Sequence, residues 1–173
     1  ELNNDPDSTA GVKISLCEDG FFYVESAKEV IARPAGVERI LHDTAEFDGK
    51  NCPIGIPKDS AAGGIIQFQH YARPLIVKGY KIKKMEARKS KLERFTGFSN
   101  AAENGLVILV RGEWNDKYIK QLEDFDPERR RQHDDYVDAT SDAYNWLISG
   151  KKLPEKFSLN PSTLTRVNQF ANF

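Results

Sequence analysis

Alternating apolar and polar positions near the start of the chain predict a β-hairpin. Residues 10–26, AGVKISLCEDGFFYVES, contain two alternating runs separated by Asp19 and Gly20. A strand places successive side chains on opposite faces, and an Asp-Gly pair accepts the positive φ angles of a tight turn. We therefore expect two antiparallel strands in this segment.

Further along the chain, apolar residues at helical spacing alternate with short apolar runs. Apolar side chains that recur every three or four residues predict helices, and short runs between turn-forming residues predict buried strands. The predicted helices are 34–49, 61–75, 91–104, 115–125 and an acidic helix after residue 132, and the predicted strands are 51–56, 76–86 and 106–110. This β-α-β order favours an α/β fold, with a largely parallel or mixed sheet and helices on its faces.

The composition fits one domain with a hydrophobic core. The chain has 173 residues, 39% of them hydrophobic, which is enough for one domain and short for two. We assign residues 1–150 to this domain and expect residues 151–173 to form an extended C-terminal tail. The formal net charge is −1, so any electrostatic signal must lie in local clusters.

Cysteine usage and hydropathy favour a reduced, cytoplasmic protein. Cys17 and Cys52 are far apart in the sequence and form no C-x-x-C pair, which argues against a disulfide scaffold or a zinc site. No apolar run approaches the ~20 residues of a membrane helix. The first residues, ELNNDPDS, are polar and acidic, unlike a signal peptide.

The predicted acidic helix gathers four aspartates without a lysine or arginine among them. They are Asp134, Asp135, Asp138 and Asp142. Three of them are four residues apart and share one stripe of the helix, where like charges repel. The helix dipole favours acids in the first turn, which accounts for Asp134 and Asp135 only. A solvated acidic face is the structural alternative to a functional cluster.

A further acid, Asp59, follows the predicted strand 51–56 in GIPKDSAAGG. Functional groups collect at the carboxyl ends of strands in open α/β sheets, although aspartate is also a common turn residue. Carboxylates that converge from a strand end and a helix start are suitable ligands for Mg²⁺ or Mn²⁺. The segment lacks the G-K-[ST] ending of a nucleotide-binding P-loop.

Positive charge is concentrated between these acids. Residues 77–95, VKGYKIKKMEARKSKLERF, contain eight Lys or Arg residues and two Glu residues. Such a stretch beside an acidic metal site suits an enzyme that cuts phosphodiesters, because the basic side chains hold backbone phosphates. The alternative is a solvated strand and helix face.

Four blocks of sequence together resemble the C-terminal nuclease domain of tailed-bacteriophage terminase large subunits. The blocks are DPDSTAGVKISLCEDGFFYVES, IPKDSAAGG, KSKLERFTGFSNAAENGLVILVRGEWNDKYIKQLEDF and HDDYVDATSDAYNWL. The last three are similar to the family patterns P-x-D-P-G-x-A-G-K, K-x-x-R followed by G-x-V and W-N, and H-D-D-x-x-D-A. The resemblance covers residues 5–147 and implies an RNase H-like fold, with a mixed central sheet of an antiparallel hairpin and parallel strands flanked by helices.

This resemblance also implies an activity and partners. The family members are metal-dependent endonucleases that cut concatemeric double-stranded viral DNA in the cytoplasm of the infected bacterial host. Two divalent ions, Mg²⁺ or Mn²⁺, serve an in-line phosphodiester hydrolysis. The expected partners are DNA, an ATPase domain upstream on the same polypeptide, the small terminase subunit and the portal protein, with no membrane involved. The 173 residues contain no Walker motif.

Residue by residue, the resemblance assigns catalytic and metal-binding roles to matched acids. Asp59 matches the acid of P-x-D, and Asp134 and Asp135 match the paired acids of H-D-D. Asp138 matches the third acid of that block and, one turn deeper, is expected to orient the helix or to act behind the ligands. His133, beside the acids, is a weaker candidate.

The third block supplies the expected DNA-binding residues. Lys91 and Arg94 match K-x-x-R and are predicted to hold phosphate, and Lys89 is a weaker addition.

Two features depart from the family pattern. SAAGG stands where the family has P-G-x-A-G-K, which changes the turn after Asp59 and removes its lysine. The family's first catalytic aspartate lies on a strand just upstream of the D-P-D block, and this sequence begins only a few residues before that block. Asp5 and Asp7 are interpreted as turn and cap residues of the loop that follows such a strand.

Two other functions remain open at the level of sequence. A junction resolvase or transposase-like nuclease shares the architecture and prefers branched DNA. A catalytically silent DNA-binding or docking module, suggested by the missing first acid, binds DNA in a salt-sensitive way without cutting it. The fold alone does not choose among these.

Overall fold

The computed structural model describes residues 8–58, 62–86, 89–129 and 132–149. These residues form five strands and five helices, arranged around two hydrophobic cores. The predicted tail at 151–173 and the candidate ligand Asp59 lie outside the described residues. Among the described residues, no helix is both long enough and apolar enough to cross a membrane.

The predicted hairpin is confirmed. Strand β1 (Thr9–Leu16) pairs antiparallel with β2 (Phe22–Val30). In the connecting turn Gly20 has a φ of 86°, and the backbone N–H of Phe21 donates to the Asp19 side chain. An aspartate that bonds its own turn and a glycine with positive φ are the features that the Asp-Gly pair predicts.

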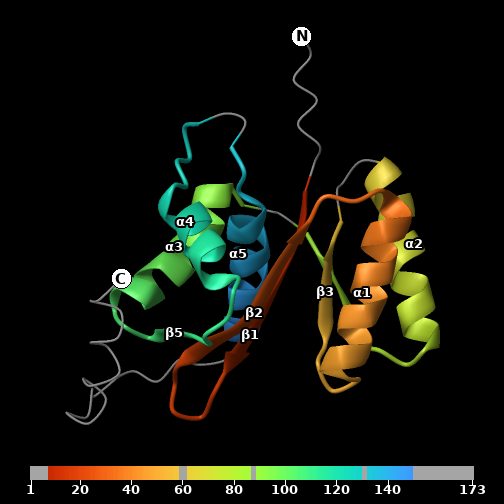
Figure 1. Ribbon diagram of the computed structural model, residues 1–173, viewed down its shortest axis with the longest axis horizontal. Helices are drawn as coiled ribbons and strands as arrows, with labels where there is room; N and C mark the ends of the chain where they lie inside the picture. The colour runs from red at the N-terminus through yellow and green to blue at the C-terminus, as the bar shows by residue number, and fades with distance from the viewer. Residues whose placement is uncertain (1–7, 59–61, 87–88, 130–131, 150–173) are drawn as a thin grey trace.

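The hairpin belongs to a mixed three-stranded sheet in the order β1-β2-β5. Strand β5 (Val107–Leu109) pairs parallel with β2. Helix α5 (Asp135–Ile148) packs on β1 and β2, with α3 (Lys91–Glu103) and α4 (Asn115–Glu123) beside it (Figure 1). A capping box fixes the start of α3, where Ser90 and Glu93 bond each other's backbone N–H.

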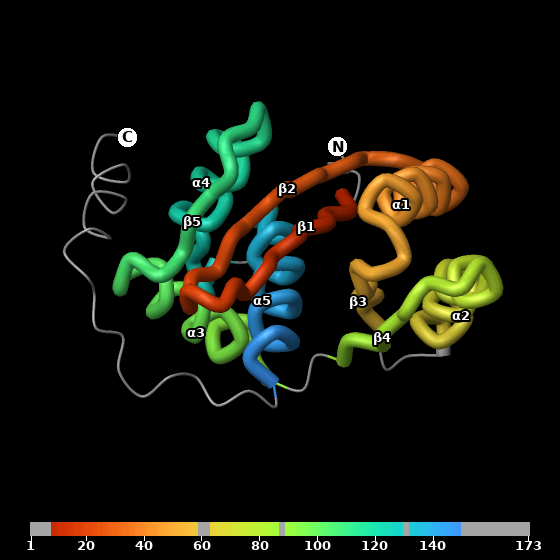
Figure 2. The backbone as a smooth tube through the Cα atoms, turned by 90° about the horizontal axis from the view of Figure 1, so that it is seen from below, coloured from red at the N-terminus to blue at the C-terminus, as the bar shows by residue number. Residues whose placement is uncertain are grey.

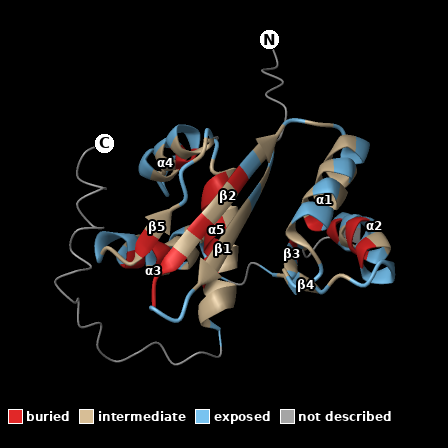
Figure 3. Cartoon of the chain, turned by 60° about the horizontal axis from the view of Figure 1, so that its bottom comes forward, coloured by how far each residue is buried: buried red, intermediate tan, exposed pale blue. Residues whose placement is uncertain are grey.

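The first core lies between this sheet and its helices and is rich in aromatic side chains. Its buried residues are Phe22, Val24, Ala27, Phe98, Ala101, Val107, Tyr118, Tyr136 and Tyr144. Phe22 and Tyr144 have ring centroids 4.7 Å apart, a contact that stabilises beyond the area it buries. Figure 3 shows the buried positions concentrated where β2 meets α5 and α3.

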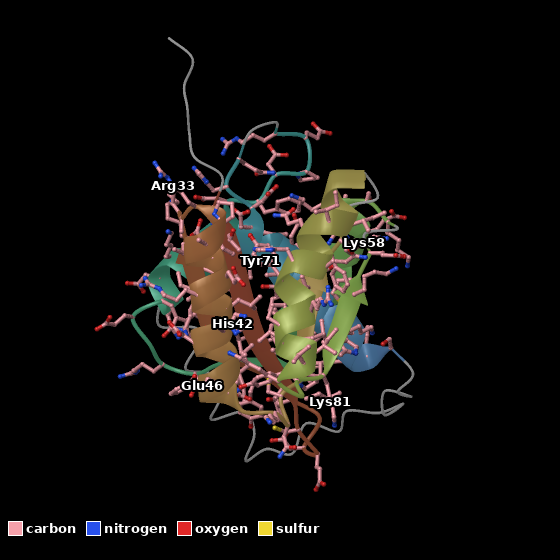
Figure 4. The ribbon with its side chains drawn as sticks, turned by 90° about the vertical axis from the view of Figure 1, so that its right-hand side faces the viewer. Arg33, His42, Glu46, Lys58, Tyr71 and Lys81 are labelled. Carbon is pink, nitrogen blue, oxygen red and sulfur yellow. The ribbon has the colours of Figure 1, made fainter. Side chains whose placement is uncertain are left out.

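The second core belongs to the middle of the chain. Helices α1 (Pro34–Asp48) and α2 (Ala62–Val77) pack with the parallel strands β3 (Ile54–Pro57) and β4 (Ile82–Met85). Its buried residues are Ala45, Ile56, Tyr71, Ala72 and Leu75. In Figure 4, Tyr71 lies between α1 and α2.

The prediction of a strand over 76–86 is wrong in its first half. Ile76 and Val77 complete α2, and only residues 82–85 form β4. The N–H groups of Gly79 and Tyr80 bond the carbonyls of Ile76 and Leu75, and Gly79 has a φ of 88°. Gly79 thus ends α2 in the left-handed conformation that favours glycine. The helix continues through Val77 although the residues from 76 onward alternate between apolar and polar.

The described strands form two sheets, which lie side by side (Figures 1 and 2). The fold is mixed α/β as expected, with a mixed sheet of parallel and antiparallel strands and a separate parallel pair. Contacts between the two parts include an ion pair from Lys13 on β1 to Asp48 on α1, at 3.1 Å. The Lys83 ammonium also lies 4.7 Å from the ring centroid of Trp146 on α5.

Candidate functional site

The four aspartates of α5 point in two directions. Asp134 is the N-cap residue of the helix, but its side chain makes no capping hydrogen bond. Asp134, Asp138 and Asp142 face α3, whereas Asp135 faces Glu29 on β2. The acids therefore serve two separate sets of contacts.

Toward α3, the three aspartates form an ion-pair ladder, defined here as Lys91, Arg94, Asp134, Asp138 and Asp142. Lys91 Nζ lies 2.6 Å from Asp134 and 2.9 Å from Asp138. The Arg94 guanidinium contacts Asp138 at 2.6 Å and Asp142 at 3.0 Å. Residues three or four apart lie on one face of a helix, so two cations on α3 match three acids on α5. The ladder offsets the repulsion that the sequence predicts within α5.

Burial and pairing shift the protonation of the ladder. Burial would lower the pKa of Lys91, but hydrogen bonds and the charges of Asp134 and Asp138 outweigh it, and the pKa is raised. For Asp142 burial dominates and raises the pKa, although Arg94 acts in the opposite direction. The ladder thus holds Lys91 firmly charged and leaves Asp142 easier to protonate than an ordinary aspartate.

Toward β2, Asp135 belongs to a group that we call the Glu29 cluster: Ser8, Glu29, Lys117, His133 and Asp135. The Ser8 hydroxyl lies 2.8 Å from Glu29 Oε1 and 2.5 Å from Asp135 Oδ2. Lys117 Nζ lies 2.8 Å from Glu29 Oε2. One ligand atom from each of Glu29, His133 and Asp135 lies within 4.8 Å of the others. Two carboxylates and an imidazole at this spacing are a donor set that fits a divalent metal ion.

The Glu29 side chain of this cluster is buried. Only 6% of its side chain is exposed. Burial alone would raise the pKa of Glu29, but hydrogen bonds from Lys117 and Ser8 and the charges of Lys117 and His133 outweigh it, so the pKa is lowered. The carboxyl is therefore held as a carboxylate and is ready to act as an oxygen ligand.

A bulge in β2 explains why the sequence pattern does not reveal Glu29. Strict alternation from Phe22 and Val24 would point residue 29 away from the core. The pairing register shifts between Lys13 and Ile14, and Glu25 is the additional residue in β2. Beyond the bulge Ala27 and Glu29 turn inward. A one-residue shift reverses the faces of a strand, and no residue type at this position signals it.

The other predicted site residues have different surroundings. Strand β3 ends at Pro57, and Lys58 follows at its carboxyl end, where its N–H donates to the Met85 carbonyl (Figure 4). The candidate ligand Asp59 comes next but is outside the described residues. Lys89 is exposed just before α3. The structure therefore brings together Asp134 with Lys91, and Asp135 with His133.

Comparison with models of protein families decides the membership of this chain. Residues 2–147 match the terminase RNaseH-like domain. The chain belongs to this family. Comparison with curated proteins and with solved structures gave no match. The match includes both described sheets, the described helices up to the last residue of α5, and the whole Glu29 cluster, so the site described above belongs to a terminase RNase H-like domain.

Family membership confirms the predicted fold and the nuclease type of the domain. RNase H-like nucleases generally use divalent metal ions, and the Glu29 cluster offers a donor set of that kind. The specific roles predicted for Asp59, Asp134 and the basic residues remain predictions.

Proposed function

We propose that this terminase RNase H-like domain is a metal-dependent endonuclease that cuts concatemeric double-stranded viral DNA during packaging. The observation that carries the proposal is the start of α5, where Asp135 stands with an imidazole and a second carboxylate in a domain of this family. Carboxylates at such a position are the ligands that phosphodiester hydrolysis by divalent ions requires.

Asp59, Asp134 and Asp135 are the proposed metal-binding residues, with Asp138 and His133 behind or beside them. When bound, two Mg²⁺ or Mn²⁺ ions supply Lewis acidity to the attacking water and to the departing 3′ oxygen. Lys91 holds the Asp134 carboxylate toward α3 through their 2.6 Å contact, so Asp134 reaches a metal ion only in exchange for this ion pair. Arg94 does the same for Asp138. The ladder thus keeps the first turn of α5 in a fixed orientation.

The proposed DNA-binding residues are Lys89, Lys91 and Arg94. Lys89 is exposed and accessible to a backbone phosphate. Lys91 and Arg94 are paired with aspartates, so they bind phosphate only in exchange for part of those ion pairs. A basic side chain contributes to DNA affinity through release of counterions from phosphate, and Lys89 contributes without breaking an ion pair.

The proposed partners follow from the place of such a domain in DNA packaging. They are double-stranded DNA, a terminase ATPase domain, the small terminase subunit and the portal protein, in the cytoplasm of an infected bacterium.

Cleavage of supercoiled plasmid tests the proposed function. The 173-residue chain is incubated with plasmid and Mn²⁺ or Mg²⁺, beside Asp59→Ala, Asp134→Ala and the exposed control Asp116→Ala on α4. We expect linear and smeared products from the parent chain and from the control, and loss of cleavage in the two site variants.

The other outcomes separate the alternative functions. Preference for a branched junction over plain duplex would replace the terminase nuclease by a resolvase-type enzyme. A folded chain that binds DNA in a salt-sensitive way but cuts it with neither ion would favour a silent DNA-binding module.

A further inference from the structure

The Glu29 cluster contains more acceptors than its serine can serve. The Ser8 hydroxyl has one proton, yet it lies within hydrogen-bond distance of both Glu29 and Asp135. A hydroxyl donates one hydrogen bond at a time, so one of the two carboxylate oxygens receives no hydrogen from Ser8. Two carboxylates that converge on one hydroxyl repel each other, so a cation between them is favourable.

The ligand types in the cluster determine which cation fits. Imidazole nitrogen is a ligand for Mn²⁺, Co²⁺ and Zn²⁺, whereas Mg²⁺ prefers oxygen ligands and retains several waters. Ligands about 2.1 Å from one ion lie roughly 3 to 4 Å apart. The three donor atoms lie within 4.8 Å of one another, so small side-chain movements bring them to one ion.

We propose that Glu29, His133 and Asp135 bind one transition-metal ion of the Mn²⁺ or Zn²⁺ class and select it over Mg²⁺. The resemblance to the family assigns no ligand role to Glu29, which lies on the hairpin rather than at a strand end or in the H-D-D block. The inference rests on the proposed nuclease function only through Asp135, which belongs to both sets of proposed ligands. It adds the residues that set the metal preference.

Lys117 competes with the metal for Glu29. Its ammonium contacts Glu29 Oε2 at 2.8 Å, and 65% of its side chain is exposed. The lysine can therefore swing into solvent when a divalent ion takes the carboxylate. Removing the lysine charge leaves the donor set intact and removes a competing cation, so it strengthens metal binding.

The site is tested by titrating the full chain with Mn²⁺. Binding is measured as the loss of the electron paramagnetic resonance signal of free Mn²⁺. Glu29→Gln and His133→Gln are each expected to weaken binding by about tenfold or more, since ligands exceed supporting residues in their effect. Matched controls are Glu25→Gln, on the same strand with its own serine and lysine partners, and His70→Gln, an exposed histidine paired with Glu38. Both controls bind Mn²⁺ like the parent chain.

A second pair of variants keeps the test independent of misfolding. Lys117→Gln is expected to tighten Mn²⁺ binding severalfold, whereas Lys120→Gln, an exposed lysine on the same helix paired with Asp124, changes nothing. Zn²⁺ displaces the bound Mn²⁺ at comparable concentration, and Mg²⁺ does so only in large excess.

Three outcomes overturn the proposal: absence of Mn²⁺ binding by the folded parent chain, unchanged affinity in both Glu29→Gln and His133→Gln, or equal displacement by Mg²⁺. Its failure is distinct from that of the nuclease function. If plasmid cleavage requires Asp134 but Glu29→Gln binds Mn²⁺ as tightly as the parent chain, the metal site is rejected and the nuclease function is supported. If the Mn²⁺ titrations give the expected results but the chain cleaves no plasmid, the metal site is supported and the nuclease function is rejected.

Discussion

Tyr118 and Thr140 form a hydrogen bond inside the first core. Their hydroxyl oxygens are 2.9 Å apart, and their residues are 1% and 0% exposed. Burial raises the pKa of Tyr118 well above its ordinary value, although the bond to Thr140 acts in the opposite direction. The Tyr118 hydroxyl is thus neutral throughout the physiological range and depends on Thr140 as its partner.

Replacing Thr140 by valine keeps the shape of the side chain but leaves the Tyr118 hydroxyl without this partner. We expect the free energy of unfolding in urea to fall by about 1 to 3 kcal/mol, the cost of an unsatisfied buried hydroxyl. The double variant Tyr118→Phe/Thr140→Val removes both partners and should regain part of the loss. A double variant less stable than Thr140→Val would contradict the hydrogen bond as the cause.

Glu29 and Asp142 give opposite contributions to stability as a function of pH. Glu29 has a pKa below its ordinary value of 4.5, so its contribution is present above that pH and is lost as the pH falls through the folded-state pKa. Asp142 has a pKa above its ordinary value of 3.8. Its folded state holds the proton more tightly, so stability falls as the pH rises from 3.8 through the folded-state pKa.

Urea unfolding of Glu29→Gln and Asp142→Asn across pH 3 to 7 measures these contributions. Relative to the parent chain, Glu29→Gln should become less destabilising as the pH falls below its ordinary value of 4.5. Asp142→Asn should become more favourable, relative to the parent chain, as the pH rises above 3.8. Parallel pH profiles for the two variants would contradict the assigned directions.

At the scale of elements, the ion-pair ladder joins α3 to α5. Arg94 has 14% of its side chain exposed and contacts both Asp138 and Asp142. Asn145 adds a hydrogen bond to the Arg94 carbonyl at 2.8 Å. Because the acids lie along one stripe of α5, removing the guanidinium takes the ladder's cation away from Asp142 and leaves Asp138 with Lys91 alone.

Arg94→Met retains much of the apolar stem and removes the charge. We expect a loss of about 1 to 3 kcal/mol in the free energy of unfolding, because partly buried acids lose their partner. Adding Asp142→Asn to this variant should recover part of the loss. As a matched control, Arg39→Met changes an exposed arginine on α1 and should change stability by less than about 0.5 kcal/mol.

At the scale of the whole molecule, Trp146 connects the two parts of the fold. It lies on α5 of the first part, and the ammonium of Lys83 on β4 of the second part lies over its ring. A side chain added at Gly55 on β3 would press on Met85 of β4 at 3.1 Å and would reach ordinary contact distance from Trp146, at 3.5 Å, so the Trp146 ring lies close to both strands of the second part. The described elements of the two parts share few contacts, so we expect each part to open separately.

Trp146→Ala should therefore loosen the second part without unfolding the first. We expect faster hydrogen exchange at the amides of β3 and β4, while those of β1 and β2 keep their protection. Phe47→Ala serves as the control, because that side chain is 87% exposed. Equal acceleration in both parts would show that they open as one unit.

Much of the fold could be predicted from short-range patterns. The Asp19-Gly20 turn, the Pro34 start and Gly49 end of α1, and the apolar face of α5 each follow from local geometry and spacing. The continuation of α2 through Val77 could not be predicted in this way. A short alternating run fits both a strand and the last turn of a helix, so the pattern does not distinguish them. The family likewise followed from blocks of residues and their order, which is information carried by the linear chain.

The sequence by itself determined the element types, the acidic first turn of α5 and the family. Only the tertiary structure decided which acid belongs to which set of contacts. Asp134 and Asp135 are neighbours in the chain, but the N-cap residue Asp134 points toward α3 and the first helical residue, Asp135, points toward Glu29 on β2. Glu29 joins Asp135 because a bulge reverses the faces of β2, and long-range packing of that kind leaves no trace in local residue spacing.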